Sequence, residues 1–182
     1  MKTRLSLLLL CSSLFASFAG AKVFDGLVIP NGEYRTLPIA VFVTPNTLGL
    51  GEDDVYRATK LRLLANKIQT IEIKSAKDFN ESGYFLFVAV NFLGDRNIFS
   101  TTIGLKKDTR KNLKQVNHWL GTLITPEQGS YGGFGIATTD RTVIDGLNTG
   151  LDNFLLDYLE SNVYVEELRE NIRKLEEEGK LK

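Results

Sequence analysis

The sequence has few of the residues that most often carry chemistry, with one cysteine, Cys11, and one histidine, His118, among 182 residues. A zinc site would have to take nearly all its ligands from carboxylates, and a Ser-His-Asp triad would have to use His118 as its base. The sequence also has no phosphate-binding P-loop, G-x-S-x-G elbow or H-E-x-x-H pair. It therefore predicts no cofactor, no metal and no catalytic residue, and an enzyme is the less favoured class.

The chain also lacks an excess of positive charge. Its 22 Lys and Arg residues balance 22 Asp and Glu residues, so the formal net charge is zero. Proteins that bind nucleic acid through phosphate contacts usually carry a clear basic surplus. We therefore expect no nucleic-acid partner and no general attraction to an anionic lipid surface.

Only the N-terminus carries a long apolar run. Lys2 and Arg4 precede an apolar stretch at residues 5–18, and the small residues Ala19-Gly20-Ala21 follow it. This order is typical of a secretory signal peptide, and the stretch is shorter than the roughly 20 residues that span a bilayer. We predict a signal peptide at residues 1–21, cleaved after Ala21, and no membrane span afterwards.

Cleavage at this position would remove the only cysteine. Lipidation of Cys11 is rejected, because Leu10 rather than a small residue precedes it and only ten residues lie upstream. An exported protein without disulfides is more typical of a bacterial envelope than of animal secretions. The sequence therefore predicts a periplasmic or secreted protein with a cysteine-free mature domain.

Apolar patterns in the mature chain predict strands and, after the first of them, a helix. Strands are expected at residues 37–44, 69–74, 84–93, 98–106 and 115–125. The segment 84–93 is almost continuously apolar, which is typical of an interior strand covered on both faces. A helix is expected at 52–66, with an apolar stripe formed by Val55, Ala58, Leu61, Ala65 and Ile68.

Two helical segments are predicted near the C-terminus. The first, residues 142–161, has a broad apolar face, and Thr142 with Asp145 resembles a capping box at its start. Gly146 and Gly150 share a face of this helix and each costs about 1 kcal/mol there. We expect these glycines to be compensated by a close approach of the helix to a sheet.

The second segment, residues 163–182, is highly charged. Its narrow apolar stripe consists of Val165, Leu168, Ile172 and Leu175. Packing on the chain's own domain is the first interpretation, and a partner or self-association helix is the alternative, because such a stripe resembles a coiled-coil seam. The sequence leaves this choice and the oligomeric state open.

Together these elements predict an α+β domain at residues 22–162, followed by a charged C-terminal helix at 163–182. The sheet is expected to be mixed, mostly antiparallel and of about five strands, with helices packed on one face. The first strand–helix–strand unit is compatible with a parallel crossover, and the short loops between the later strands favour antiparallel neighbours.

The most unusual loop is the glycine-rich segment Gly129–Gly135. Its rings, Tyr131 and Phe134, together with Trp119 and His118 of the predicted strand, are the candidate binding residues. We expect a non-enzymatic binding domain that contacts a protein partner in the bacterial cell envelope, since loops carry function more often than the framework does. The alternatives are a periplasmic module that binds a small ligand or glycan in a pocket lined by Tyr131, Phe134 and Trp119, and a hydrolase with His118 as base.

Overall fold

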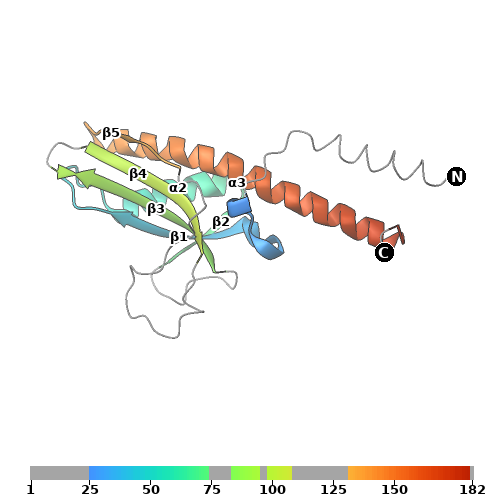
Figure 1. Cartoon of the computed structure of the whole chain (residues 1–182). Helices are drawn as coiled ribbons and strands as arrows, with labels where there is room; N and C mark the ends of the chain where they lie inside the picture. The colour runs from blue at the N-terminus through green and yellow to red at the C-terminus, as the bar shows by residue number, and fades with distance from the viewer. Residues whose placement is uncertain (1–24, 74–82, 95–97, 108–130, 181–182) are drawn as a thin grey trace, which may run out of the picture.

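The structure, a computed structural model, describes residues 25–73, 83–94, 98–107 and 131–180. The predicted signal peptide and the predicted strand at 115–125, which carries His118 and Trp119, lie outside these residues and stay predictions. The described chain forms a five-stranded mixed sheet with two α-helices on one face (Figure 1), so the predicted α+β class is confirmed.

The sheet has the strand order β2-β1-β3-β4-β5. Its members are β1 (Thr36–Val43), β2 (Gln69–Glu72), β3 (Tyr84–Leu93), β4 (Ile98–Lys107) and β5 (Phe134–Ile136). The pairings of β1 with β2 and with β3 are parallel, whereas those of β4 with β3 and with β5 are antiparallel. The first strand–helix–strand unit, β1–α2–β2, therefore has parallel strands, as the sequence allowed.

Strand β3 takes the centre of the sheet and β2 an edge. In β3, neighbouring residues that point to opposite faces are buried together, as Phe85 and Leu86 show, which confirms the predicted interior strand. Strand β2 is four residues long and keeps Ile71 exposed. A short, half-exposed strand is typical of a sheet edge. Strand β3 therefore pairs with β1 in the interior of the sheet, although β2 comes directly before β3 in the sequence.

Helix α2 (Glu52–Ala65) begins one residue after Gly51, whose N–H donates to the carboxylate of Asp54 over 3.1 Å. The helix was predicted, and its buried face only in part, since Val55 and Ala58 of the predicted stripe pack on the core. Val55, Thr59 and Leu63 face the core, whereas Leu61 is 62% exposed. The predicted stripe through Leu61 is thus wrong, because contact with β1 and β2 selects the four-residue spacing.

Helix α3 (Asp140–Glu177) is one uninterrupted helix where the sequence predicted two segments. It begins two residues before Thr142. Its N-cap is Thr139, whose hydroxyl accepts from the Thr142 backbone N–H over 3.3 Å. The predicted capping box is therefore wrong, and Asp145 instead pairs with Arg141 at 3.9 Å.

The predicted boundary falls at Ser161 and Asn162, which are buried within α3. The Asn162 amide donates to the Leu27 carbonyl and accepts from the Ile29 N–H, each over 2.8 Å. These partners belong to the N-terminal segment that holds the short 3-10 helices η1 (Asp25–Leu27) and η2 (Pro30–Arg35). A tertiary contact therefore keeps polar residues inside the helix.

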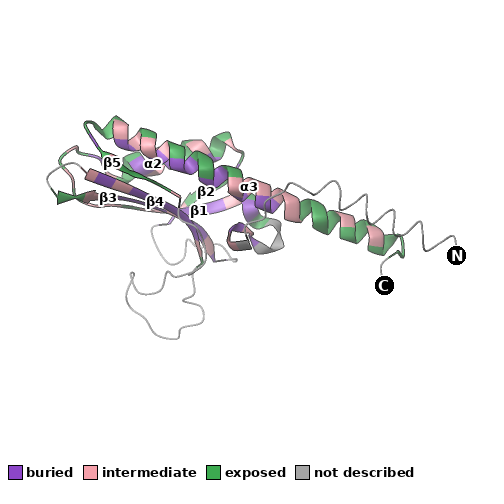
Figure 2. Cartoon of the chain, turned by 45° about the horizontal axis from the view of Figure 1, so that its top comes forward, coloured by how far each residue is buried: buried purple, intermediate pink, exposed green. Residues whose placement is uncertain are grey.

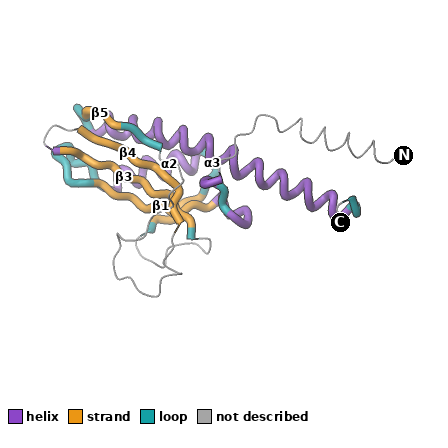
Figure 3. The backbone as a smooth tube through the Cα atoms, viewed as in Figure 1, coloured by secondary structure: helices purple, strands orange, loops and turns teal. Residues whose placement is uncertain are grey.

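Burial changes along α3. Figure 2 shows the half that packs on the sheet with many buried residues and the C-terminal end mostly exposed or intermediate. The backbone trace in Figure 3 shows the same end running past the sheet. The domain thus consists of a compact body from which one helix projects.

Candidate functional site

The glycine-rich segment, predicted to be a loop, forms an edge of the sheet over its described part. Tyr131 and Ile103 exchange backbone hydrogen bonds of 2.6 and 2.8 Å, and the Gly133 carbonyl accepts from the Thr101 N–H. Strand β5 follows directly. Propensity did not reveal this strand because it has three residues, one of them glycine.

Tyr131 is held against α3. Its ring meets the ring of Phe154 edge-on, with centroids 5.6 Å apart, and its hydroxyl donates to the Asp157 carboxylate over 2.6 Å. Burial and the neighbouring Asp157 both raise the pKa of Tyr131 above its usual value. The side chain therefore joins the sheet edge to the helix.

Phe134 has the opposite environment, because its ring is 88% exposed on β5 and Ile136, two residues on, is also exposed. Of the four predicted binding residues, Tyr131 packs on α3 and Phe134 faces solvent. Trp119 and His118 lie outside the described residues, so the pocket predicted from Tyr131, Phe134 and Trp119 stays a prediction.

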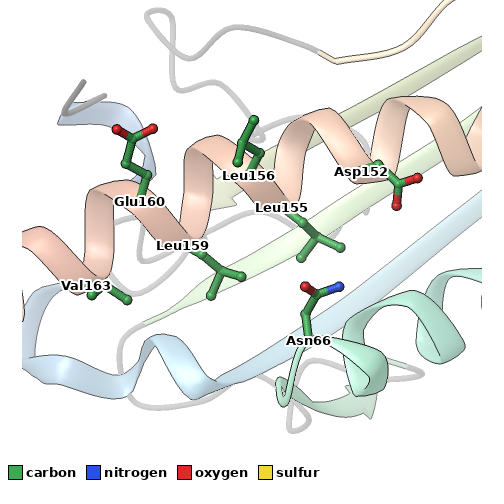
Figure 4. A pocket seen from close by; sticks show the side chains of 7 residues that line it. All are labelled: Asn66, Asp152, Leu155, Leu156, Leu159, Glu160 and Val163. Atoms are coloured by element: carbon green, nitrogen blue, oxygen red, sulfur yellow. The ribbon is translucent and has the colours of Figure 1, made fainter. Parts of the chain in front are cut away.

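A groove with a volume of about 560 Å³ lies between α3 and the end of α2. Figure 4 shows Leu155, Leu159 and Val163 pointing from α3 toward Asn66, which follows the last residue of α2. The other lining residues are Asp152, Leu156 and Glu160. The groove therefore has a largely apolar wall with two carboxylates at its margin.

Contacts at the end of α2 and in the middle of α3 hold the groove in shape. The Asn66 amide donates to the Arg62 carbonyl over 3.0 Å, and Arg62 forms an ion pair with Asp152 of α3 at 3.4 Å. Leu156 on the rim is 67% exposed. The sequence signal that bears on this site is the broad apolar face of α3, which by itself does not place α2 beside it.

A second exposed surface is the projecting end of α3. The Tyr34 hydroxyl donates to the Glu166 carboxylate over 2.6 Å and fixes the helix where it leaves the body. Burial, followed by this hydrogen bond, raises the pKa of Tyr34. Further along, Leu168 and Ile172 are 38% and 41% exposed.

The charged residues of this end pair with one another. Arg173 contacts Glu170 at 3.0 Å and Glu177 at 3.3 Å, and Lys174 contacts Glu170 at 3.5 Å. The hydrogen bond from Arg173 lowers the pKa of Glu170. Exposed pairs of this kind add little stability. They occupy the charged side of the helix and leave the apolar stripe uncovered.

Within the described ranges, no helix is both long and apolar enough to cross a membrane. In the same part of the chain, no three His, Cys, Asp or Glu side chains gather where they would hold a metal ion. Comparisons with protein-family models, with curated proteins and with solved structures found no match to this chain. The described helices carry two exposed apolar surfaces, the groove between α2 and α3 and the projecting end of α3.

Proposed function

We propose that this chain is an exported, non-enzymatic binding domain that acts by protein–protein contact in the bacterial cell envelope. The observation that carries the proposal is the groove between α2 and α3, with Leu156 exposed on its rim. The apolar residues that line this groove beside two carboxylates resemble the composition of a protein interface, where an apolar centre is surrounded by a polar rim.

The shape of the groove favours a protein partner over a small molecule. It is bounded by the end of α2 and the middle of α3, and its lining offers Asn66, Asp152 and Glu160 as polar groups. Asp152 is already paired with Arg62. Small-ligand sites usually enclose most of the ligand with several convergent polar groups. An apolar side chain or short helix of a partner would fit this groove better.

The envelope location rests on the N-terminal sequence. A basic start, a 14-residue apolar stretch and a small-residue cleavage site together favour export. The alternatives of a ligand pocket near Trp119 and of a hydrolase based on His118 gain no support from the described residues. Tyr131 in particular is engaged with Asp157 and Phe154.

Site-directed photocrosslinking in intact bacterial cells tests the proposal. A photoreactive phenylalanine analogue replaces Leu156 on the groove rim. In a matched control it replaces Leu61, an equally exposed leucine of α2 outside the groove. We expect a discrete crosslinked protein from position 156, found in the envelope fraction, and none from position 61. The N-terminus of the purified chain is sequenced alongside.

Equal crosslinking from both positions, or none from position 156, would remove the groove as a binding site. A chain that starts at Met1 and stays in the cytosol would remove the export part of the proposal. Each result bears on a separate part of the proposed function, because crosslinking reports the surface and sequencing reports the compartment.

A further inference from the structure

The apolar stripe that packs on the sheet continues along the projecting end of α3. Alternating steps of three and four residues define the stripe, and it runs through Leu151, Phe154, Tyr158, Ser161, Val165, Leu168, Ile172 and Leu175. The first four are buried, whereas Leu168 and Ile172 are partly exposed. A straight helix drifts only ~20° per seven residues from this repeat, so both parts lie on the same side of α3.

This stripe has the pattern of a coiled-coil seam. Val165 and Ile172 take the position called a of the seven-residue repeat, and Leu168 and Leu175 take the position called d. The ion pairs of Glu170, Arg173, Lys174 and Glu177 lie at positions b, c and f, on the outer side. The seam residues therefore remain free to pack on another helix.

The body of the protein excludes a parallel pair. In a parallel coiled coil the two helices stay side by side, so a partner helix would continue along the seam toward Leu151 and Phe154. Those residues pack on the chain's own sheet and are fully buried. In a parallel pair the partner's helix would therefore overlap the sheet of this chain, which leaves no space for it because the interior is close-packed.

An antiparallel pair avoids this clash, because the two bodies then lie at opposite ends of the paired segment. With the two-fold axis at residue 170, Val165 of one copy meets Leu175 of the other, and Leu168 meets Ile172. Each of these contacts occurs twice, which gives four layers of a and d side chains. The arrangement is closed, because both copies use the same surface.

The charges beside the seam fit the same arrangement. Arg169 and Glu176 both occupy position e, on one flank of the stripe, and within the described part of the chain neither forms an ion pair. In an antiparallel pair the same flanks of the two helices face each other. Arg169 of each copy therefore leans toward Glu176 of the other, and such flanking pairs help to set partner and orientation.

We propose that two copies of this chain associate through the projecting end of α3, as a short antiparallel coiled coil centred on residue 170. The partner that covers the stripe is thus a second copy of this chain. This self-association goes beyond the proposed contact at the groove and does not depend on it. Four layers predict a weak dimer whose population rises with protein concentration.

Disulfide trapping of the full chain tests the orientation, with Cys11→Ser so that introduced thiols are the only ones. Val165 and Leu175 are ten residues apart, or about 15 Å along the helix, too far to link within one chain. We expect Val165→Cys combined with Leu175→Cys to give a covalent dimer linked between positions 165 and 175 on oxidation. Leu175→Cys alone should stay monomeric, because the two copies of residue 175 lie at opposite ends of the pair.

Sedimentation equilibrium of the purified chain tests the association itself. We expect a mass that rises toward two copies with concentration, and Leu168→Glu with Ile172→Glu should return it to one copy. Asn153→Glu adds a negative charge to an exposed position of α3 nearer its N-terminus and should leave the dimer unchanged. Circular dichroism of each variant confirms that it is folded.

A chain that stays monomeric up to ~1 mM would overturn the proposal. A dimer that survives the two glutamates, or efficient trapping through Leu175→Cys alone, would overturn this interface and its orientation. None of these results changes the photocrosslinking at Leu156, so failure of the dimer and failure of the groove can be told apart.

Discussion

Gly150 of α3 and Gly132, just before β5, are in direct backbone contact: a Cβ atom on Gly150 would lie 3.3 Å from the Cα of Gly132. The same Cβ would lie 2.7 Å from Ile103 Cδ1. The close approach of the helix to the sheet, predicted from glycines in a helical segment, is therefore confirmed. Gly132 itself has φ +151°, and a Cβ there would meet the Thr101 carbonyl oxygen. Two glycines thus allow α3 to lie on the sheet edge.

We predict that Gly150→Ala lowers the free energy of unfolding by up to about 2 kcal/mol, because an overpacking cost of about 1–3 kcal/mol outweighs the gain of about 1 kcal/mol from alanine in a helix. Gly146→Ala is the matched control on the same helix face. Its Cβ would lie 3.5 Å from the Phe99 ring, an ordinary contact. Because alanine is favoured over glycine inside a helix, Gly146→Ala should instead gain up to about 1 kcal/mol. Urea unfolding of both variants measures the difference, and equal effects would refute the close approach at Gly150.

The link between Tyr131 and Asp157 gives a second prediction. Tyr131→Phe keeps the ring contact with Phe154 but removes the 2.6 Å hydrogen bond to the carboxylate. We expect a loss of about 1 kcal/mol, below the usual value for a bond to a charged group because both side chains are partly exposed. Chemical unfolding measures the loss. No loss in Tyr131→Phe would show that the hydroxyl does not hold the sheet edge to α3.

Buried tyrosines predict a loss of stability at alkaline pH. Tyr158 is fully buried and its hydroxyl donates to the Tyr34 carbonyl over 2.7 Å. Burial raises the pKa of Tyr158 above the value of about 10 expected in the unfolded chain. The folded state thus favours the neutral ring. Its contribution is complete below pH ~10 and is lost as pH rises toward the folded-state pKa, by up to about 1.4 kcal/mol per pH unit.

Tyr158→Phe separates this effect from the titration of lysines in the same range. The variant should be less stable than the parent at pH 7, because it loses the hydrogen bond to Tyr34. Between pH 10 and 11 its free energy of unfolding should fall less steeply than that of the parent. Urea unfolding at several pH values gives both slopes, and parallel slopes would contradict the prediction.

The sequence predicted the parts of this fold that depend on local pattern. The runs at 37–44 and 84–93 became β1 and β3 almost residue for residue. Periodicity also located α2, and the cost of Gly146 and Gly150 indicated the close helix–sheet contact. In β3 and at the two glycines, the residues that define the pattern are also the ones that the fold buries or packs closely.

The features that the sequence did not predict depend on distant contacts. Strand β5 exists because Gly133 and Tyr131 meet β4, and no local propensity indicates a strand there. In α2, two spacings of apolar residues were possible, and packing against the sheet selected Leu63 over Leu61. The groove at Leu156 requires the end of α2 to be placed beside α3, which no pattern in either helix specifies.

The break predicted between residues 161 and 163 leads to the last prediction, at Asn162. This side chain is 3% exposed and makes three hydrogen bonds of 2.8 Å, to the Leu27 carbonyl, the Ile29 N–H and the Tyr158 carbonyl. Asn162→Leu would fill similar space but leave buried backbone groups of Leu27 and Ile29 without partners. We expect a loss of about 3 kcal/mol in the free energy of unfolding.

Hydrogen exchange shows where that loss occurs, because the N–H of Ile29 donates directly to Asn162. Exchange of the Ile29 N–H should accelerate strongly in Asn162→Leu. Exchange of the β3 amides should change only as far as the global stability changes. Asn153→Leu, an exposed asparagine of the same helix, is the control and should stay within about 0.5 kcal/mol of the parent. If both variants behave alike, Asn162 does not anchor the N-terminal segment, and the hydrogen bonds of Tyr34 with Glu166 and Tyr158 must hold this segment to α3 instead.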